Sequence, residues 1–315
     1  MNHNGMGIDI LGDWNIAKTH TTFLSIGKSN AITIDNSTVI PTVLINGSTV
    51  LNSTFLFGNG IDGNSTMVMN TMLVRDMYYN FLTLKENVVL HTNGYRLFVK
   101  NRLILQKDSN ISCNGNDAMG ETGGEIAKSG TIGGGGIGGG CDDFGEFVKE
   151  DKFINACGGK GGRQGKKNVE EVLEKVNYEK ISVNDGGLEV LNSVENAMKA
   201  RDLNNVRING GGGGSAGSAT GGGSGGGVIV IVANNIVFND RSSITAMGGS
   251  GENIEGRHID GTAGGGGGGG VVIVITTSRD VKKNVFVFGG KGGRGKSDLL
   301  SGEKGENGTV VIHEV

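Results

Sequence analysis

The sequence predicts a mainly β fold, in which a parallel β-solenoid is packed with glycine-rich strips and carries a small helical insert. Three observations predict this fold: glycine runs that end at Val/Ile strands, a strand unit that repeats about every 21 residues, and a low aromatic content. Glycine accounts for 61 of the 315 residues, far above the roughly 7% of an average protein. Aromatic residues make up 5% of the chain, so we do not expect one bulky globular core.

The longest glycine runs stop directly at strands. GGGSGGGVIVIV covers residues 221–232, and GGGGGGGVVIVI covers residues 264–275. Flexible linkers do not alternate with blocks of strong strand formers, so we expect ordered glycines, with disordered glycines as the alternative. Extended glycine chains can approach one another closely because they lack Cβ. In the left-handed conformation with three residues per turn they can exchange backbone hydrogen bonds laterally, which predicts polyglycine II-like strips.

A strand unit of about 21 residues recurs along the chain. LTLKENVVLHTNG (residues 82–94) aligns without a gap to LILQKDSNISCNG (residues 103–115), and residues 101–115 align to residues 234–248 at an offset of 133. A looser copy spans residues 271–292, and a truncated copy ends the chain. Short strands and tight turns in this period match one rung of a parallel β-solenoid, whose inner face is buried only by stacking.

Composition divides the chain into four regions. Residues 1–60 contain short β-rich runs between Asn, Gly and Ser, and we expect an N-terminal β attachment module there. Residues 61–140 are the predicted solenoid rungs leading into the first glycine tract. Residues 141–207 form a charged insert, and residues 208–315 form the glycine-rich β-repeat region.

The insert is the only region with helical periodicity. Residues 168–181 and residues 188–201 each place apolar residues on one side of a helix. We therefore expect two short amphipathic helices that either carry contacts or act as a spacer.

Charge and composition exclude several classes of protein. The formal net charge is −3, which argues against a nucleic-acid-binding protein and against a polybasic membrane anchor. The single proline, Pro41, excludes collagen. No segment reaches the roughly 18 apolar residues of a membrane helix, so we expect no membrane insertion. The first residues lack the basic and apolar regions of a secretory signal, so we expect synthesis in a host cytoplasm. The cysteines fit no metal-binding spacing and are expected to be free: Cys113, Cys141 and Cys157.

One motif formally matches a phosphate-binding P-loop. Gly290–Ser297 fits G-x-x-x-x-G-K-S and follows the strand Val285–Phe288. A P-loop opens into a helix, whereas glycine breaks the chain soon after Ser297. The core GGKGGR also occurs at residues 158–163, so we interpret the match as a repeated glycine element and expect no cofactor.

No cluster of side chains predicts catalysis or metal binding. The histidines are scattered along the chain. The acidic turns at residues 62–64 and 142–143 could bind calcium, but ordinary turns are the favoured interpretation. Asp76, Glu86 and Asp108 are the carboxylates on the clear rungs, and their spacing singles out no pair. We therefore expect no catalytic residues, no metal and no enzymatic activity.

An aromatic group near residue 80 is the best candidate for surface contact. Tyr78, Tyr79 and Phe81 lie close in sequence to Tyr95 and Arg96. These side chains could stack on a sugar, but capping of the solenoid or contact with a subunit is the favoured role.

The family resemblance of this chain rests on RDMYYN (residues 75–80), on TNGYR (residues 92–96) and on glycine tracts that end in VIVIVA-like strands. Residues 57–116 and 208–315 resemble the glycine-rich tail-fibre, tail-tip and receptor-binding appendage proteins of tailed bacteriophages and related viruses. The glycine tracts are also similar to the polyglycine sandwich at the adhesin tip of some long-tailed phages. This resemblance carries over no catalytic residue.

The resemblance implies a virion structural protein, a fibre or appendage subunit that mediates attachment to the host cell surface. Its expected partners are other virion structural proteins and a host-surface glycan or protein receptor. A homo-oligomer is expected, with a trimer favoured because it would shield the ends and edges of the solenoid. The alternatives are a capsid decoration or minor structural protein without a receptor role, and a polysaccharide depolymerase on the same scaffold.

Overall fold

The computed structural model describes residues 56–125, 127–128, 130–140, 201, 208–254 and 261–315, together with the backbone of four strands before them. The chain divides into two compact units, Met1–Asn52 and Ser53–Val315. Apart from Arg201, the predicted helical insert at residues 141–207 lies outside the described residues.

The first unit contains a four-stranded antiparallel sheet. Its strands follow one another in sheet order as β1 (Phe23–Ile26), β2 (Asn30–Asp35), β3 (Thr42–Ile45) and β4 (Ser48–Val50). These strands coincide with the β-rich runs recognised in the sequence.

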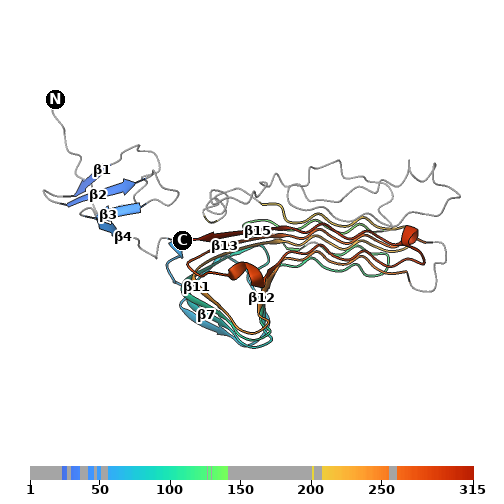
Figure 1. The fold of residues 1–315 in the computed structure, drawn as a ribbon, viewed down its shortest axis with the longest axis horizontal. Helices are drawn as coiled ribbons and strands as arrows, with labels where there is room; N and C mark the ends of the chain where they lie inside the picture. The colour runs from blue at the N-terminus through green and yellow to red at the C-terminus, as the bar shows by residue number, and fades with distance from the viewer. Residues whose placement is uncertain are drawn as a thin grey trace, which may run out of the picture. The chain divides into compact units, whose positions relative to one another are not determined.

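The second unit is mainly β and contains two parallel sheets (Figure 1). Successive strands alternate between the sheets, and the helical elements of the described C-terminal part are two short 3₁₀ turns, η3 (Val281–Asn284) and η4 (Asp298–Leu300). The six-stranded sheet has the order β15 (Thr309–Glu314), β13 (Val271–Thr276), β11 (Val228–Phe238), β9 (Arg96–Leu105), β7 (Met77–Leu84) and β5 (Asn64–Met67). The five-stranded sheet has the order β14 (Val285–Phe286), β12 (Ser243–Thr245), β10 (Asn110–Ser112), β8 (Val89–His91) and β6 (Thr71–Met72).

The sequence offsets of 21 and 133 reappear as strand registers. Leu82 of β7 pairs with Leu103 of β9, and Leu103 pairs with Ile236 of β11. In the smaller sheet Asn110 of β10 pairs with Ser243 of β12. Parallel stacking at these offsets places inward-facing residues above one another, so they form columns of buried aliphatic side chains. Leu82 and Leu103 are fully buried in this core.

Asparagines form a side-chain ladder where the register of the large sheet shifts. The Nδ2 of Asn80 donates to Oδ1 of Asn64 at 3.0 Å, and the Nδ2 of Asn101 donates to Oδ1 of Asn80 at 2.5 Å. The shift lies between Tyr79 and Phe81 in β7. A ladder of amides bonded strand to strand fixes the register at a point where the backbone pairing is interrupted.

The turns that lead from the large sheet to the small one share a left-handed residue. Asn87, Asp108, Arg241 and Asp280 have φ between 54° and 60°. The N–H of Asn87 donates to the carbonyl of Lys107, and the N–H of Asp108 donates to the carbonyl of Asp240, so neighbouring turns are bonded to one another. Asn and Asp tolerate this conformation better than other non-glycine residues.

Beyond the sheets, the glycine-rich segments lie beside one another as extended chains and exchange backbone hydrogen bonds (Figure 1). We call this assembly the glycine bundle. It consists of residues 113–125, 130–140, 208–220, 221–227, 246–254, 261–270, 287–297 and 301–308.

Hydrogen bonding in the glycine bundle repeats every third residue. Each N–H of residues 221–227 donates to a carbonyl, and donors three residues apart share the same neighbouring segment. Residues 221, 224 and 227 donate to Gly120, Asn116 and Cys113; residues 222 and 225 donate to Gly139 and Gly136; residues 223 and 226 donate to Gly265 and Gly268. A period of three residues per turn is that of the polyproline II helix family. These glycines are therefore ordered by hydrogen bonds to several neighbours at once.

Close approach explains why the inner segments are glycine. A Cβ at Gly225 would lie 1.8 Å from the carbonyl oxygen of Gly211, and a Cβ at Gly267 would lie 2.0 Å from that of Ser224. The outer segment 301–308 needs glycine only at every third position, Gly302, Gly305 and Gly308. The number of glycines per three residues therefore follows the number of neighbouring chains.

Candidate functional site

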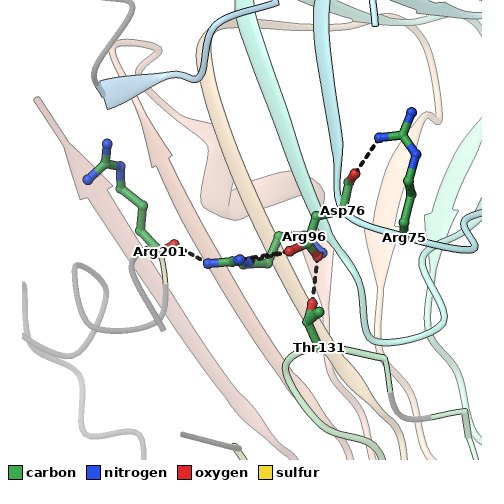
Figure 2. A network of polar contacts seen from close by, with 5 residues as sticks. All are labelled: Arg75, Asp76, Arg96, Thr131 and Arg201. Carbon is green, nitrogen blue, oxygen red and sulfur yellow. Dashed lines mark hydrogen bonds and ion pairs between the residues drawn. The ribbon is translucent and has the colours of Figure 1, made fainter. Parts of the chain in front are cut away.

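An ion pair at the start of two neighbouring strands organises the region of the predicted contact residues. Asp76 immediately precedes β7, and Arg96 is the first residue of β9, which pairs with β7. The Nε and Nη2 of Arg96 donate to Oδ2 of Asp76 at 2.9 and 2.7 Å, and the backbone N–H of Arg96 donates to Oδ1 at 2.8 Å (Figure 2). The Asp76 and Arg96 side chains are only 12% and 13% exposed. Removal of either side chain would therefore leave the other as an unpaired, poorly solvated charge.

Two distant segments of the chain join this ion pair. The Oγ1 of Thr131 donates to Oδ1 of Asp76 at 2.5 Å, and Nη1 of Arg96 donates to the carbonyl of Arg201 at 2.5 Å (Figure 2). Thr131 lies at the start of a glycine-bundle segment, and Arg201 precedes the next one. The cluster therefore fastens the glycine bundle to the large sheet. Both carboxylate oxygens of Asp76 accept hydrogen bonds, so Asp76 is not available as a catalytic base.

Arg75 holds a second carboxylate on the same side. Its Nη2 lies 2.6 Å from Oδ1 of Asp62 and its Nη1 donates to Oδ2 at 3.1 Å. Nη1 also donates to the carbonyl of Asp76 at 2.9 Å (Figure 2). The hydrogen bonds from Arg75 hold the pKa of the Asp62 carboxyl below its usual value. The backbone N–H of Tyr78 donates to the same carboxylate at 2.7 Å.

Four of the predicted contact residues, Tyr78, Tyr79, Tyr95 and Arg96, lie in different surroundings. The Tyr78 ring stacks on Phe98 with centroids 4.6 Å apart, and the Arg96 guanidinium lies 5.6 Å from the Phe98 ring centroid. Tyr79 is 7% exposed and belongs to the core, where burial raises the pKa of its phenol. Tyr95 is half-buried and packs against that core. Consecutive residues of a strand point to opposite faces of the sheet, so Tyr78 and Tyr79 of β7 lie on different faces. The strand pattern of the sequence already indicated this separation.

The three carboxylates considered on the rungs do not gather into one site. Asp76 lies before β7, whereas Glu86 follows it, and a strand of this length spans about 25 Å. Paired carboxylates of glycosidases lie within about 10 Å of one another. Asp108 is held by Arg241, whose Nη2 lies 2.7 Å from its Oδ2.

The P-loop-like sequence is a segment of the glycine bundle. The N–H of Gly290 donates to Gly267 at 2.7 Å, the N–H of Gly293 donates to Gly264 at 2.8 Å, and η4 follows in place of a long helix. The amides of Gly290 and Gly293, which a P-loop would direct at phosphates, are thus bonded to the bundle.

This same segment forms part of a regular outer surface that the sequence motifs did not reveal. Phe288, Lys291 and Arg294 are exposed at every third position, while glycines between them face neighbouring chains. The adjacent segment carries Met247, Ser250 and Asn253 at the same interval, and its amides donate to the carbonyls of Phe288, Lys291 and Arg294. We call these six residues the display face. The triplet pattern of GGKGGR is the signal that could have identified it.

In the described part of the chain no group of three or more His, Cys, Asp or Glu residues is placed to hold a metal ion. The described residues also include no helix of the length and apolar character required to cross a membrane. Comparisons with protein-family models, with curated proteins and with solved structures found no match to this chain.

Proposed function

We propose that the protein is a structural subunit of a virus particle, whose second unit is a parallel β-solenoid with a polyglycine II bundle and which mediates attachment to the host surface. The observation that carries this proposal is the glycine bundle with its display face. Ordering glycine costs about 1–2 kcal/mol per residue in backbone entropy, and the ordered segments 246–254 and 287–297 carry the side chains of the display face at every third position. Such a construction suits a rigid support for surface contacts.

The spacing of the display face favours a repeating ligand. Three residues of a polyproline II-type chain rise about 9 Å, so Lys291 and Arg294 present cations at a fixed interval. A ligand with regularly spaced anionic or hydroxyl groups, such as a host-surface glycan, could contact several positions at once. Because the backbone is held by its own hydrogen bonds, little entropy is lost on binding.

The first test is the location of the chain. Antibodies to the full chain should label intact particles of the source virus in electron microscopy, and particles without label would refute a virion role. Purified chain should also bind host cells and block infection. Labelled particles with no cell binding at saturating concentration would leave a structural component without a receptor role.

The second test addresses the display face. The double variant Lys291→Glu/Arg294→Glu should reduce binding to host cells at least tenfold because it reverses both exposed cations. Lys282→Glu/Lys283→Glu reverses two exposed cations in η3 and serves as the matched control. Equal losses in both variants would mean that net charge, and not the display face, governs binding.

A further inference from the structure

The first turn of the second unit exposes an unusual number of large apolar side chains. Eleven large hydrophobic residues of the described chain are exposed, and six of them fall between residues 61 and 81. They are Ile61, Val68, Met69, Met72, Val74 and Phe81, with exposed fractions from 42% to 77%. We call them the first-turn patch.

Among the described strands, the same turn forms the edge of both parallel sheets. β5 is the last strand of the six-stranded sheet, and β6 is the last strand of the five-stranded sheet. Exposed edges are usually protected by charged residues, proline or bulges. β5 reads NSTM and β6 reads TM, so both strands are short, but neither contains a charged residue or a proline.

The area of the first-turn patch is that of an interaction site. A fully buried side chain of this size removes about 60–120 Å² of apolar surface from water. At these exposed fractions, the six residues together present about 400 Å², a total comparable to the area of functional patches. Two such patches would bury about 800 Å² before the surrounding rim is counted, which approaches the roughly 1,200 Å² of a stable interface.

We propose that the first-turn patch is covered by the same patch of a second copy of this chain, with the two β5 edges paired antiparallel about a two-fold axis. An uncharged apolar surface is complementary to itself, and the nearby ions Arg75 and Asp62 already neutralise each other. The opposite edge of the sheets offers no matching surface, since β15 ends in His313 and Glu314 and η3 exposes Lys282 and Lys283. An edge strand accepts one neighbour, so the geometry favours a dimer over the trimer expected from the sequence.

The mass of the full chain in solution tests this interface. Sedimentation at micromolar concentration should give about twice the 32.5 kDa of the monomer. Val68→Asp/Met69→Asp should weaken association at least 100-fold and leave the monomer, because it places two charges in the contact. Leu299→Asp is the control, since Leu299 is 67% exposed outside the patch. A monomeric wild type, a trimer, a filament, or a dimer untouched by the double substitution would overturn the proposal.

Disulfide cross-linking through a cysteine placed in the edge strand β5 tests the same interface without a measurement of affinity. Thr66 lies in β5 and is exposed, so Thr66→Cys should form a disulfide between copies under mild oxidation, whereas Leu299→Cys should not. Native cysteines set the background, which the wild-type chain measures. Equal cross-linking of both variants would rule out β5 as the contact.

Discussion

Alanine at position 290 should destabilise the glycine bundle, because Gly290 is enclosed on several sides by backbone. A Cβ there would lie 1.8 Å from the carbonyl oxygen of Gly249, whereas Cβ atoms in proteins essentially never lie closer than 3.0 Å to a neighbouring atom. Residues 287–297 would therefore have to move away from residues 246–254 by roughly 1.2 Å, the difference between these two distances.

The energetic cost follows from the bonds that such a movement breaks. Gly248 donates to Phe288 at 2.9 Å and Gly251 donates to Lys291 at 2.8 Å, and both bonds would exceed a useful length. Two lost hydrogen bonds cost about 1–3 kcal/mol, and strain in a packed interior adds about 1–3 kcal/mol. Alanine recovers about 0.4–1 kcal/mol by restricting the unfolded chain, so we expect a net loss of about 1–6 kcal/mol.

Denaturant unfolding of the full chain measures this loss, with amide exchange at residues 287–297 to assign it to the bundle. Lys291→Ala is the matched control, because the adjacent Lys291 side chain is exposed and its removal should change stability by no more than about 0.5 kcal/mol. Equal stability of Gly290→Ala and Lys291→Ala would refute the close packing of glycine segments.

Three further outcomes are expected. Amide exchange across residues 221–227 should be slow, as each N–H is bonded, and exchange at the rate of an unstructured peptide would contradict an ordered bundle. Arg241→Asn should raise the unfolding free energy by about 0.5–1 kcal/mol. Arg241 has a left-handed φ of 54°, which asparagine adopts with less strain, and the substitution removes one exposed ion pair with Asp108. A lower thermal midpoint would show that the ion pair contributes more to stability than the relieved strain. Burial lowers the pKa of His313 below 6.5, and its buried Nε2 has no hydrogen-bond partner in the described residues. Stability should therefore fall as pH drops below 6.5 toward the folded-state pKa, and His313→Leu should flatten that pH dependence in unfolding measurements.

The strands of the two parallel sheets are predictable from the sequence, because stacked strands repeat the same pattern of residues at fixed offsets. Leu82, Leu103 and Ile236 occupy one column, so their spacing in sequence is the register of the sheet. Aliphatic residues at alternate positions and tight turns complete the pattern, which requires no knowledge of distant contacts. The order in the glycine runs was predictable for a related reason, since glycine in such numbers is useful where a Cβ has no room.

The candidate contact residues were only partly predictable. Tyr78 and Arg96 lie near the same Phe98 ring, but Tyr79 is part of the core. The partner of Arg96 is Asp76, twenty residues earlier, and its second partner is the carbonyl of Arg201, more than one hundred residues later. No local pattern marks such pairs, because they form only when separate strands and segments meet.

By itself, therefore, the sequence determined the strand units, their offsets and the positions where only glycine fits. The tertiary structure decided which glycine segments neighbour one another, which side chains reach the display face, and how Asp76 and Arg96 fasten the bundle to the sheet. The physical reason is that lateral hydrogen bonds between glycine chains join identical backbone groups. Such bonds carry no residue-specific signal. Which glycine segments become neighbours is therefore set by the positions of the strands to which the segments are joined.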